Sequence, residues 1–177
     1  MERKFLRIVV ASIALMFLVP FAAQAKDIKI THTAGKYRFE LNVLNAEAFA
    51  PAGGAPQSGM GGMPGMGHGG MMMVVKGGAA PVPLDDPSHP NHHLVVHVID
   101  KASGKPLTDA TVTIGVTPLD QNGKDVGATM QVPVAVMEAS GMGAASTHYG
   151  NNVTLAPGSY RVEVNANGVT SKFRIKL

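Results

Sequence analysis

The fold class is decided by the C-terminal sequence YRVEVNANGVTSKFRI, residues 160–175. Largely apolar side chains recur at every second position on both sides of Asn167-Gly168. A period of two is that of a β-strand with one buried face. Asn-Gly is a preferred pair for a two-residue hairpin loop, because both positions of that turn need a positive φ. The stretch therefore predicts an antiparallel β-hairpin.

Earlier runs in the chain repeat this pattern. Alternating apolar residues occupy positions 28–31, 37–43, 94–98, 110–116 and 132–136. Turn residues separate several of them, as in Ser103-Gly104-Lys105-Pro106 and Gln121-Asn122-Gly123. Short strands with turn residues between them are typical of an antiparallel sandwich or barrel. Helix patterns are nearly absent after residue 25, so we expect an all-β antiparallel sandwich.

Residues 1–25 have the organisation of a secretory signal peptide. Three basic residues precede an apolar run over residues 8–21, and the small residues of Ala23-Gln24-Ala25 form a cleavage site. The apolar run is shorter than the ~20 residues of a membrane-spanning helix, and Pro20 interrupts it. We therefore expect cleavage after Ala25 and a periplasmic mature protein.

The composition restricts the chemistry. The chain contains no cysteine, which excludes disulfides, a lipid-anchored lipoprotein, blue-copper centres, iron–sulfur clusters and thiolate zinc sites. Methionine, histidine and carboxylate remain as metal ligands. The net charge is +3, and no basic block follows the first 25 residues. We therefore do not expect nucleic acid as a partner.

The mature chain divides into three parts. Residues 26–49 are expected to supply N-terminal strands of the domain, and residues 92–177 the main sandwich. Residues 50–91 are rich in Gly, Pro and Met and show no apolar period. A structureless stretch of this length is uncommon inside a compact domain and is usually functional or disordered. We expect it to be a flexible, disordered insertion.

The insertion holds a cluster of soft metal ligands. Thioether sulfur favours Cu(I), and a glycine-rich backbone allows several sulfurs to converge on one ion. The alternatives are an inert linker and a methionine-lined surface for protein binding. The candidate ligands are Met60, Met63, Met66, His68, Met71, Met72 and Met73.

A second group of candidate ligands lies in the sequence SHPNHHLVVH, residues 88–97. On a strand, residues of one parity share a face, so His93 and His97 lie opposite the apolar face of Leu94 and Val96. At ~3.3 Å per residue, His93 and His97 are about 13 Å apart, too far for both to bind one ion. We therefore interpret His97 as a surface histidine.

A third group consists of Met137, Met142 and His148, which bracket a glycine-rich loop between expected strands. A methionine and a histidine placed there could close on His93 from a neighbouring strand. The alternative is that Met137 is a core residue and His148 caps a turn.

Residues 92 to about 164 resemble the periplasmic high-affinity iron-transport proteins of Gram-negative bacteria. These are copper-containing, immunoglobulin-like dimeric domains that work beside an inner-membrane iron permease. The matching features are His93-Leu94 at the start of a strand, a proline-containing strand leading into a loop with methionine, His148-Tyr149-Gly150 followed by Asn152-Val153, and Pro157-Gly158-x-Tyr160. The resemblance implies an immunoglobulin-like fold. It also implies copper ligation by His93, His148 and a methionine that is either Met137 or Met142.

The chain departs from the family pattern at two places. Val132-Pro133-Val134 stands where the family has Met-Pro-Met, and Val95 stands where the family has a glutamate implicated in iron binding. The resemblance therefore implies copper as the preferred ion and ferrous iron as the second choice. It also implies a homodimer and an inner-membrane metal permease as partners.

These observations predict a periplasmic metal-binding protein that acts as a carrier, a buffer or an accessory to metal uptake. The alternative is a metal-independent immunoglobulin-like adhesion or scaffold module, because the pattern of residues 98–112 is widespread in such modules. We do not expect an enzyme. No nucleophile–base motif is visible, and the mature chain would begin at Lys26 rather than at the N-terminal histidine that a copper-dependent polysaccharide-cleaving enzyme uses.

Overall fold

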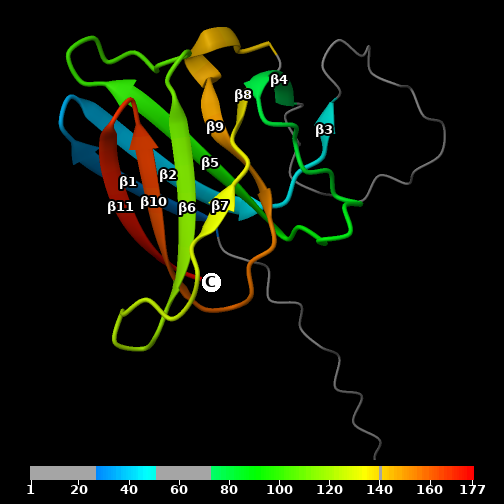
Figure 1. The fold of residues 1–177 in the computed structure, drawn as a ribbon. Coiled ribbons are helices and arrows are strands. Elements are labelled where there is room, and N and C mark those ends of the chain that lie inside the picture. The colour runs from blue at the N-terminus through cyan, green and yellow to red at the C-terminus, as the bar shows by residue number, and fades with distance from the viewer. Residues whose placement is uncertain (1–26, 51–72, 140) are drawn as a thin grey trace, which may run out of the picture.

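The computed structural model describes residues 27–50, 73–139 and 141–177. Two β-sheets pack face to face as a sandwich (Figure 1). The larger sheet has the order β1 (Ile28–Ala34), β2 (Tyr37–Asn45), β5 (His92–Asp100), β9 (His148–Val153), β8 (Ala135–Ala139), β4 (Met73–Gly78) and β3 (Phe49–Ala50). The smaller sheet has the order β11 (Val169–Lys176), β10 (Ser159–Ala166), β6 (Val112–Leu119) and β7 (Met130–Val132). The prediction of an all-β antiparallel sandwich is confirmed.

The C-terminal hairpin has the expected geometry. Strands β10 and β11 pair antiparallel, and the last pair before the loop joins Ala166 to Val169. Asn167 and Gly168 form the loop with φ values of 48° and 83°. This is the conformation for which Asn-Gly is selected.

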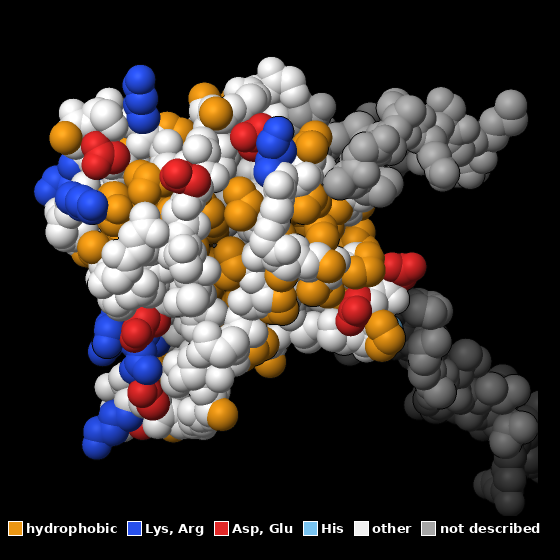
Figure 2. Space-filling model, turned by 45° about the horizontal axis from the view of Figure 1, so that its top comes forward, with side chains coloured by type: hydrophobic (Ala, Val, Ile, Leu, Met, Phe, Trp, Pro, Cys, Tyr) orange, Lys and Arg blue, Asp and Glu red, His pale blue; other side chains and the backbone are white. Residues whose placement is uncertain are grey.

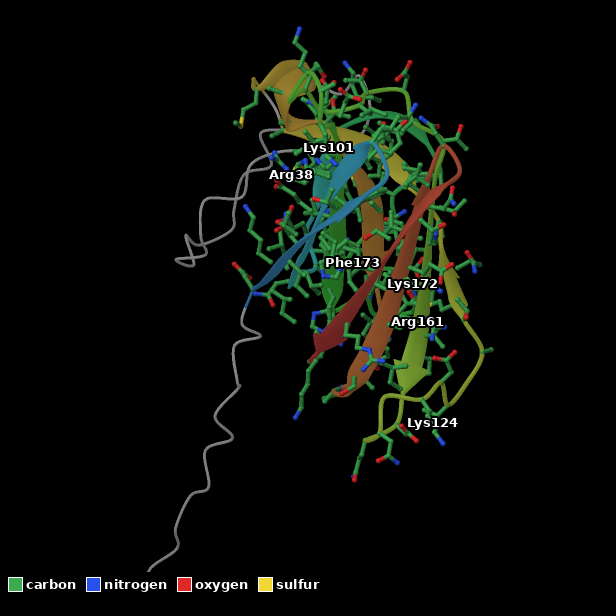
Figure 3. All side chains as sticks on the ribbon, turned by 90° about the vertical axis from the view of Figure 1, so that its left-hand side faces the viewer. Arg38, Lys101, Lys124, Arg161, Lys172 and Phe173 are labelled. Carbon is green, nitrogen blue, oxygen red and sulfur yellow. The ribbon has the colours of Figure 1, made fainter. Side chains whose placement is uncertain are left out.

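The core lies between the two sheets and is built from alternate residues of their strands. On the smaller sheet, Phe173 is fully buried and lies between the layers, whereas Lys172 and Arg161 lie on the outer side (Figure 3). Burying an aliphatic or aromatic side chain of this size stabilises the fold by about 1.5–3 kcal/mol. The core therefore depends on the alternation that is visible in the sequence.

The run at residues 132–136 is not one strand, as the sequence pattern indicated. Val132 ends β7 in the smaller sheet, and Ala135 begins β8 in the larger sheet, so the chain crosses between the sheets at Pro133-Val134. Proline has no N–H group for a sheet ladder, which explains why pairing stops there. The carbonyl of Pro133 accepts a hydrogen bond from the side chain of Asn151 instead.

The expected flexible segment at residues 50–91 needs correction at its C-terminal end. Residues 73–78 form β4, which pairs antiparallel with β8 and parallel with β3. Strand β4 begins with Met73 and two valines. The valines are β-branched, and such residues fit a pleated sheet. Gly78 has a φ of 82°, and a Cβ there would lie 2.5 Å from the carbonyl oxygen of Val134, so β4 reaches β8 only with glycine at this position.

Several expectations fall on residues that are not described. Residues 1–25, the expected signal peptide, lie outside the described residues. So do Met60, Met63, Met66, His68, Met71 and Met72. Met73 is described and begins β4. Within residues 27–50, 73–139 and 141–177, no helix is long and apolar enough to cross a membrane.

The larger sheet curves back over itself. Strand β3 follows β2 in the chain after three residues, yet it lies at the opposite edge of the sheet, beside β4 (Figure 1). The ring of Phe49 on β3 nevertheless packs against the ring of His93 on the central strand β5, with centroids 5.4 Å apart. The edge formed by β4 and β3 therefore covers the outer face of β5, which would otherwise be in solvent.

Charged and apolar side chains are unevenly distributed over the surface. On the face drawn in Figure 2, lysine and arginine side chains gather mostly toward one side, and apolar side chains occupy the middle. Large exposed apolar residues include Val74 on β4 and Met142 beside the short 3-10 turn η1 (Gly143–Ser146). The β4–η1 side of the molecule is thus partly apolar.

Candidate metal centre

A second buried region lies on the outer face of the larger sheet. Leu94 and Val96 of β5 point into the core, while His93 and Val95 point the other way. His93 and Val95 are nonetheless 0% and 4% exposed. Phe49 packs against the ring of His93, and the strand is buried on both faces.

The sheet register places the candidate ligands on one face of the larger sheet. His148 on β9 pairs with Met137 on β8, and cross-strand neighbours of this kind have Cβ atoms about 4.5–5.5 Å apart. His93 on β5 pairs with Asn152, four residues further along β9 than His148. The rings of His93 and His148 nevertheless lie near each other, with centroids 6.2 Å apart.

Gly150 lets strand β9 lie close to strand β5. It lies midway between His148 and Asn152 on β9 and is paired with Val95 and with Ala135. A Cβ at this position would lie 1.7 Å from the carbonyl oxygen of Leu94. The close pairing of the strands beside the two histidines therefore depends on glycine here.

The hydrogen bonds of His93 define which ring nitrogen carries the proton. Its Nδ1 lies 2.9 Å from Oδ1 of Asn152. The amide nitrogen of Asn152 donates to the carbonyls of Glu47 and Val82, which fixes its oxygen as the acceptor toward His93. Nδ1 of His93 is therefore the donor, and Nε2 carries a lone pair.

His148 has the same arrangement with a backbone partner. Its Nδ1 lies 3.0 Å from the carbonyl oxygen of Ser146, which can only accept. Its Nε2 therefore also carries a lone pair. Holding Nδ1–H on a carbonyl so that Nε2 is free and oriented is how proteins prepare metal-binding histidines.

The two Nε2 atoms are buried, and no hydrogen-bond partner for either is found among the described residues. A buried polar atom without a partner costs about 1–3 kcal/mol, so such atoms are rare and need an explanation. Burial and, to a smaller extent, the neighbouring His148 lower the pKa of His93 to about 4. Burial also lowers the pKa of His148. Both rings are therefore neutral near pH 7, which is the form that binds metal.

The ring separation fits a shared ion. Imidazoles that bind one ion through nitrogens about 2.0–2.1 Å away have ring centroids roughly 5–6.5 Å apart, over the range from tetrahedral to linear coordination. The observed 6.2 Å between His93 and His148 lies within this range. The separation of the rings is thus compatible with a shared ion.

The structure places the two candidate methionines differently. Met137 is 0% exposed and sits opposite His148, outside the main core cluster between the sheets. Met142 is 56% exposed at the start of η1. Met137 is therefore the cross-strand neighbour of His148, and Met142 is an exposed residue beside η1. His148 begins β9, and its Nδ1 bonds the carbonyl of Ser146, the last residue of η1.

The sequence pattern did not identify His97 as a neighbour of this centre. Its side chain is partly exposed, and its ring centroid lies 5.6 Å from that of His148. Nδ1 of His97 donates to the carbonyl oxygen of Thr147 at 3.0 Å. The 13 Å spacing along β5 still separates it from His93, but His148 lies between the two.

Phe49 and Asn152 were also missed as parts of the centre. Asn152 follows the His-Tyr-Gly motif by two residues, so its parity on the strand could have placed it on the histidine face. Phe49 had no such signal, because it reaches His93 only through the curvature of the sheet.

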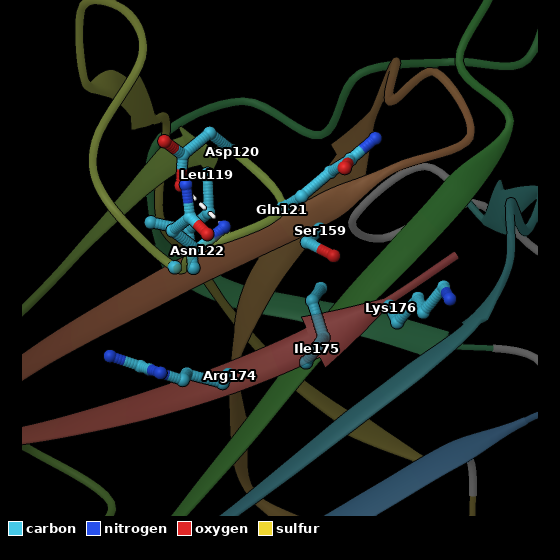
Figure 4. A pocket seen from close by; sticks show the side chains of 9 residues that line it. Leu119, Asp120, Gln121, Asn122, Ser159, Arg174, Ile175 and Lys176 are labelled. Atoms are coloured by element: carbon cyan, nitrogen blue, oxygen red, sulfur yellow. Dashed lines mark hydrogen bonds between the residues drawn. The ribbon is translucent and has the colours of Figure 1, made fainter.

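The described residues contain no group of three His, Cys, Asp or Glu side chains that could hold a metal ion. A metal site here must therefore include methionine or use only two imidazoles. A separate surface pocket of about 350 Å³ is lined by Leu119, the turn at residues 120–123, Ser159 and residues 174–176 (Figure 4). These residues belong to the smaller sheet and its turn, so this pocket is not the histidine centre.

No protein-family model matches the chain, and no curated protein or solved structure does. The resemblance to the periplasmic iron-transport proteins therefore stays a prediction. The roles of His93, His148 and Met137 rest on the geometry of this fold.

Proposed function

We propose that this protein binds Cu(I) through His93, His148 and Met137 and acts as a periplasmic copper carrier or buffer. The observation that carries the proposal is the pair of buried Nε2 lone pairs without partners, 6.2 Å apart between ring centroids. A fully buried thioether lies directly across the strand pair from one of them. Imidazole and thioether together are the ligands that a soft, monovalent copper ion prefers.

The charge of the centre favours copper over iron. All three candidate ligands are uncharged, and the site is buried. Burying a divalent ion without a negative ligand costs more than burying a monovalent one, because the solvation energy rises steeply with charge. Ferrous iron sites usually include a carboxylate, and the residue beside His93 on this face is the apolar Val95.

Carriage or buffering fits the site better than catalysis. The centre lies under Phe49 and the β3–β4 edge, with no nucleophile among its ligands. The signal-peptide pattern of residues 1–25 supports a periplasmic location, where a copper carrier would serve an inner-membrane permease. A role as an accessory to metal uptake follows from that location.

The proposal is tested by competing the mature protein against a chromophoric Cu(I) chelator under anaerobic, reducing conditions. We expect one tightly bound ion at the histidine centre. Both His148→Ala and Met137→Leu should weaken its binding. Leucine conserves the volume of methionine and removes only the sulfur. His89→Ala is the matched control, because His89 is an exposed residue in the proline-rich approach to β5. Equal affinities for wild type, Met137→Leu and His148→Ala would favour the metal-independent scaffold module.

A further inference from the structure

His97 adds a third imidazole to the edge of the centre. Val96 on β5 pairs with Tyr149 on β9. The next residues on the two strands, His97 and His148, are therefore opposite each other on the same face. The Nδ1–H of His97 is held by the carbonyl of Thr147. Its Nε2 therefore carries a lone pair, as in the two buried histidines. Unlike them, His97 is partly exposed, so this lone pair can be reached from solvent.

The three imidazole rings form two neighbouring pairs that share His148. His148 lies 6.2 Å from His93 and 5.6 Å from His97 between ring centroids. Both separations fall in the range of about 5–6.5 Å that a shared ion allows. The described residues hold no group of three His, Cys, Asp or Glu side chains that could share one ion. His148 therefore belongs to two candidate copper positions.

We propose that His97 and His148 form an outer copper position through which Cu(I) enters and leaves the inner position of His93, His148 and Met137. The proposal rests on the proposed function. The ion first binds Nε2 of His97, then gains Nε2 of His148, and then exchanges His97 for His93. The first two steps add a neutral ligand, and the third replaces one neutral ligand by another. No electron is transferred, and each Nδ1 keeps its proton, which stays hydrogen-bonded to its oxygen acceptor.

The surroundings of His97 agree with passage of a monovalent ion. Glu40 on β2 is the cross-strand partner of His97. The carboxylate of Glu40 lies 3.1 Å from Nε of Arg38 and is paired with that cation. An ion at the outer position would therefore have two neutral imidazoles as ligands, beside a carboxylate that Arg38 already engages.

The experiment measures transfer rates as well as affinity. Stopped-flow absorbance follows Cu(I) moving from its bicinchoninate complex to the mature protein and back to excess chelator. His97→Gln is the main variant, because its amide can still donate to the carbonyl of Thr147 and preserve packing. His97→Ala is the second variant, and His89→Ala is the exposed control.

We expect His97→Gln and His97→Ala to slow both loading and release at least about tenfold while changing the dissociation constant less than about threefold. His89→Ala should leave both rates unchanged. Unchanged rates in the His97 variants would overturn the proposal. So would a loss of affinity as large as that of His148→Ala, because His97 would then be an inner ligand. Failure of the wild-type protein to take up Cu(I) would instead refute the proposed function.

Discussion

Strand β5 has two buried faces that are built for different purposes. The face toward the core carries Leu94 and Val96, which are fully buried among apolar side chains. The face toward the β3–β4 edge carries His93, which is equally buried but has a nitrogen without a partner. Apolar burial stabilises the fold, whereas burying an unpaired nitrogen costs stability. The difference indicates that the first face maintains the structure and the second face serves a ligand.

The largest expected effect is on the core face. Leu94→Ala should lower the free energy of unfolding by about 2–5 kcal/mol, because it removes a fully buried side chain and leaves a cavity. Urea unfolding followed by circular dichroism measures the loss. The copper affinity of the folded fraction should stay close to that of wild type. A loss of affinity without a loss of stability would contradict the separation of the two faces.

The second prediction concerns the pH dependence of the metal-free protein. The pKa of His93 is lowered from 6.5 to about 4 in the folded state, mainly by burial. Below pH 6.5 the unfolded chain takes up a proton that the folded protein excludes, so stability falls as the pH drops toward 4. At 1.36 kcal/mol per pKa unit, the loss over this window is about 3 kcal/mol. The lowered pKa of His148 acts in the same direction.

This loss is measured as the urea midpoint of metal-free protein at a series of pH values. Carboxylates also titrate in the lower part of the window, so the comparison with His93→Leu isolates the contribution of the imidazole. The slope of His93→Leu should be clearly shallower than that of wild type between pH 6.5 and 4. Parallel curves would show that His93 is not kept neutral by the fold.

The comparison between the two faces also explains what the sequence could predict. The core face follows from alternation alone, so Leu94, Val96 and the hairpin at residues 160–175 were placed correctly. The parity of His93 and Val95 was also correct. Their burial was not expected, because it depends on the return of β3 over the sheet. No local pattern encodes a contact between Phe49 and a strand four positions away in the sheet.

The same limitation applies to β4 and to the crossing at Pro133. Residues 73–78 are a short apolar run next to a segment rich in glycine, and short runs of this kind are ambiguous without their pairing partner. The alternation at Val132, Val134 and Val136 continues through the proline, although the two halves belong to different sheets. Strand pairing between distant segments decided both cases.

The third prediction tests the support of His93 by Asn152. Asn152→Ala removes the acceptor that fixes Nδ1–H, and loss of such a support usually lowers metal affinity by about 10–100-fold. Asn151→Ala is the matched control. Asn151 bonds the carbonyls of Ala80 and Pro133 and the N–H of Val82, so it anchors the same segment without touching an imidazole. Equal losses of Cu(I) affinity in the two variants would assign Asn152 a merely structural role.

The smallest expected effect is a gain of stability. His93→Leu removes the buried Nε2 that has no partner and replaces the ring by an apolar side chain. The Oδ1 atom of Asn152 still accepts a hydrogen bond from the N–H of Glu47, so it is not left without a donor. We therefore expect metal-free His93→Leu to be about 1 kcal/mol more stable than wild type at pH 7, within the 1–3 kcal/mol cost of an unpaired buried polar atom. The variant should at the same time lose the inner copper position. Thermal and urea unfolding measure the first effect, and chelator competition measures the second. A loss of stability comparable to that of Leu94→Ala would show that His93 is a packing residue like those of the core face, and the contrast between the two faces of β5 would no longer hold.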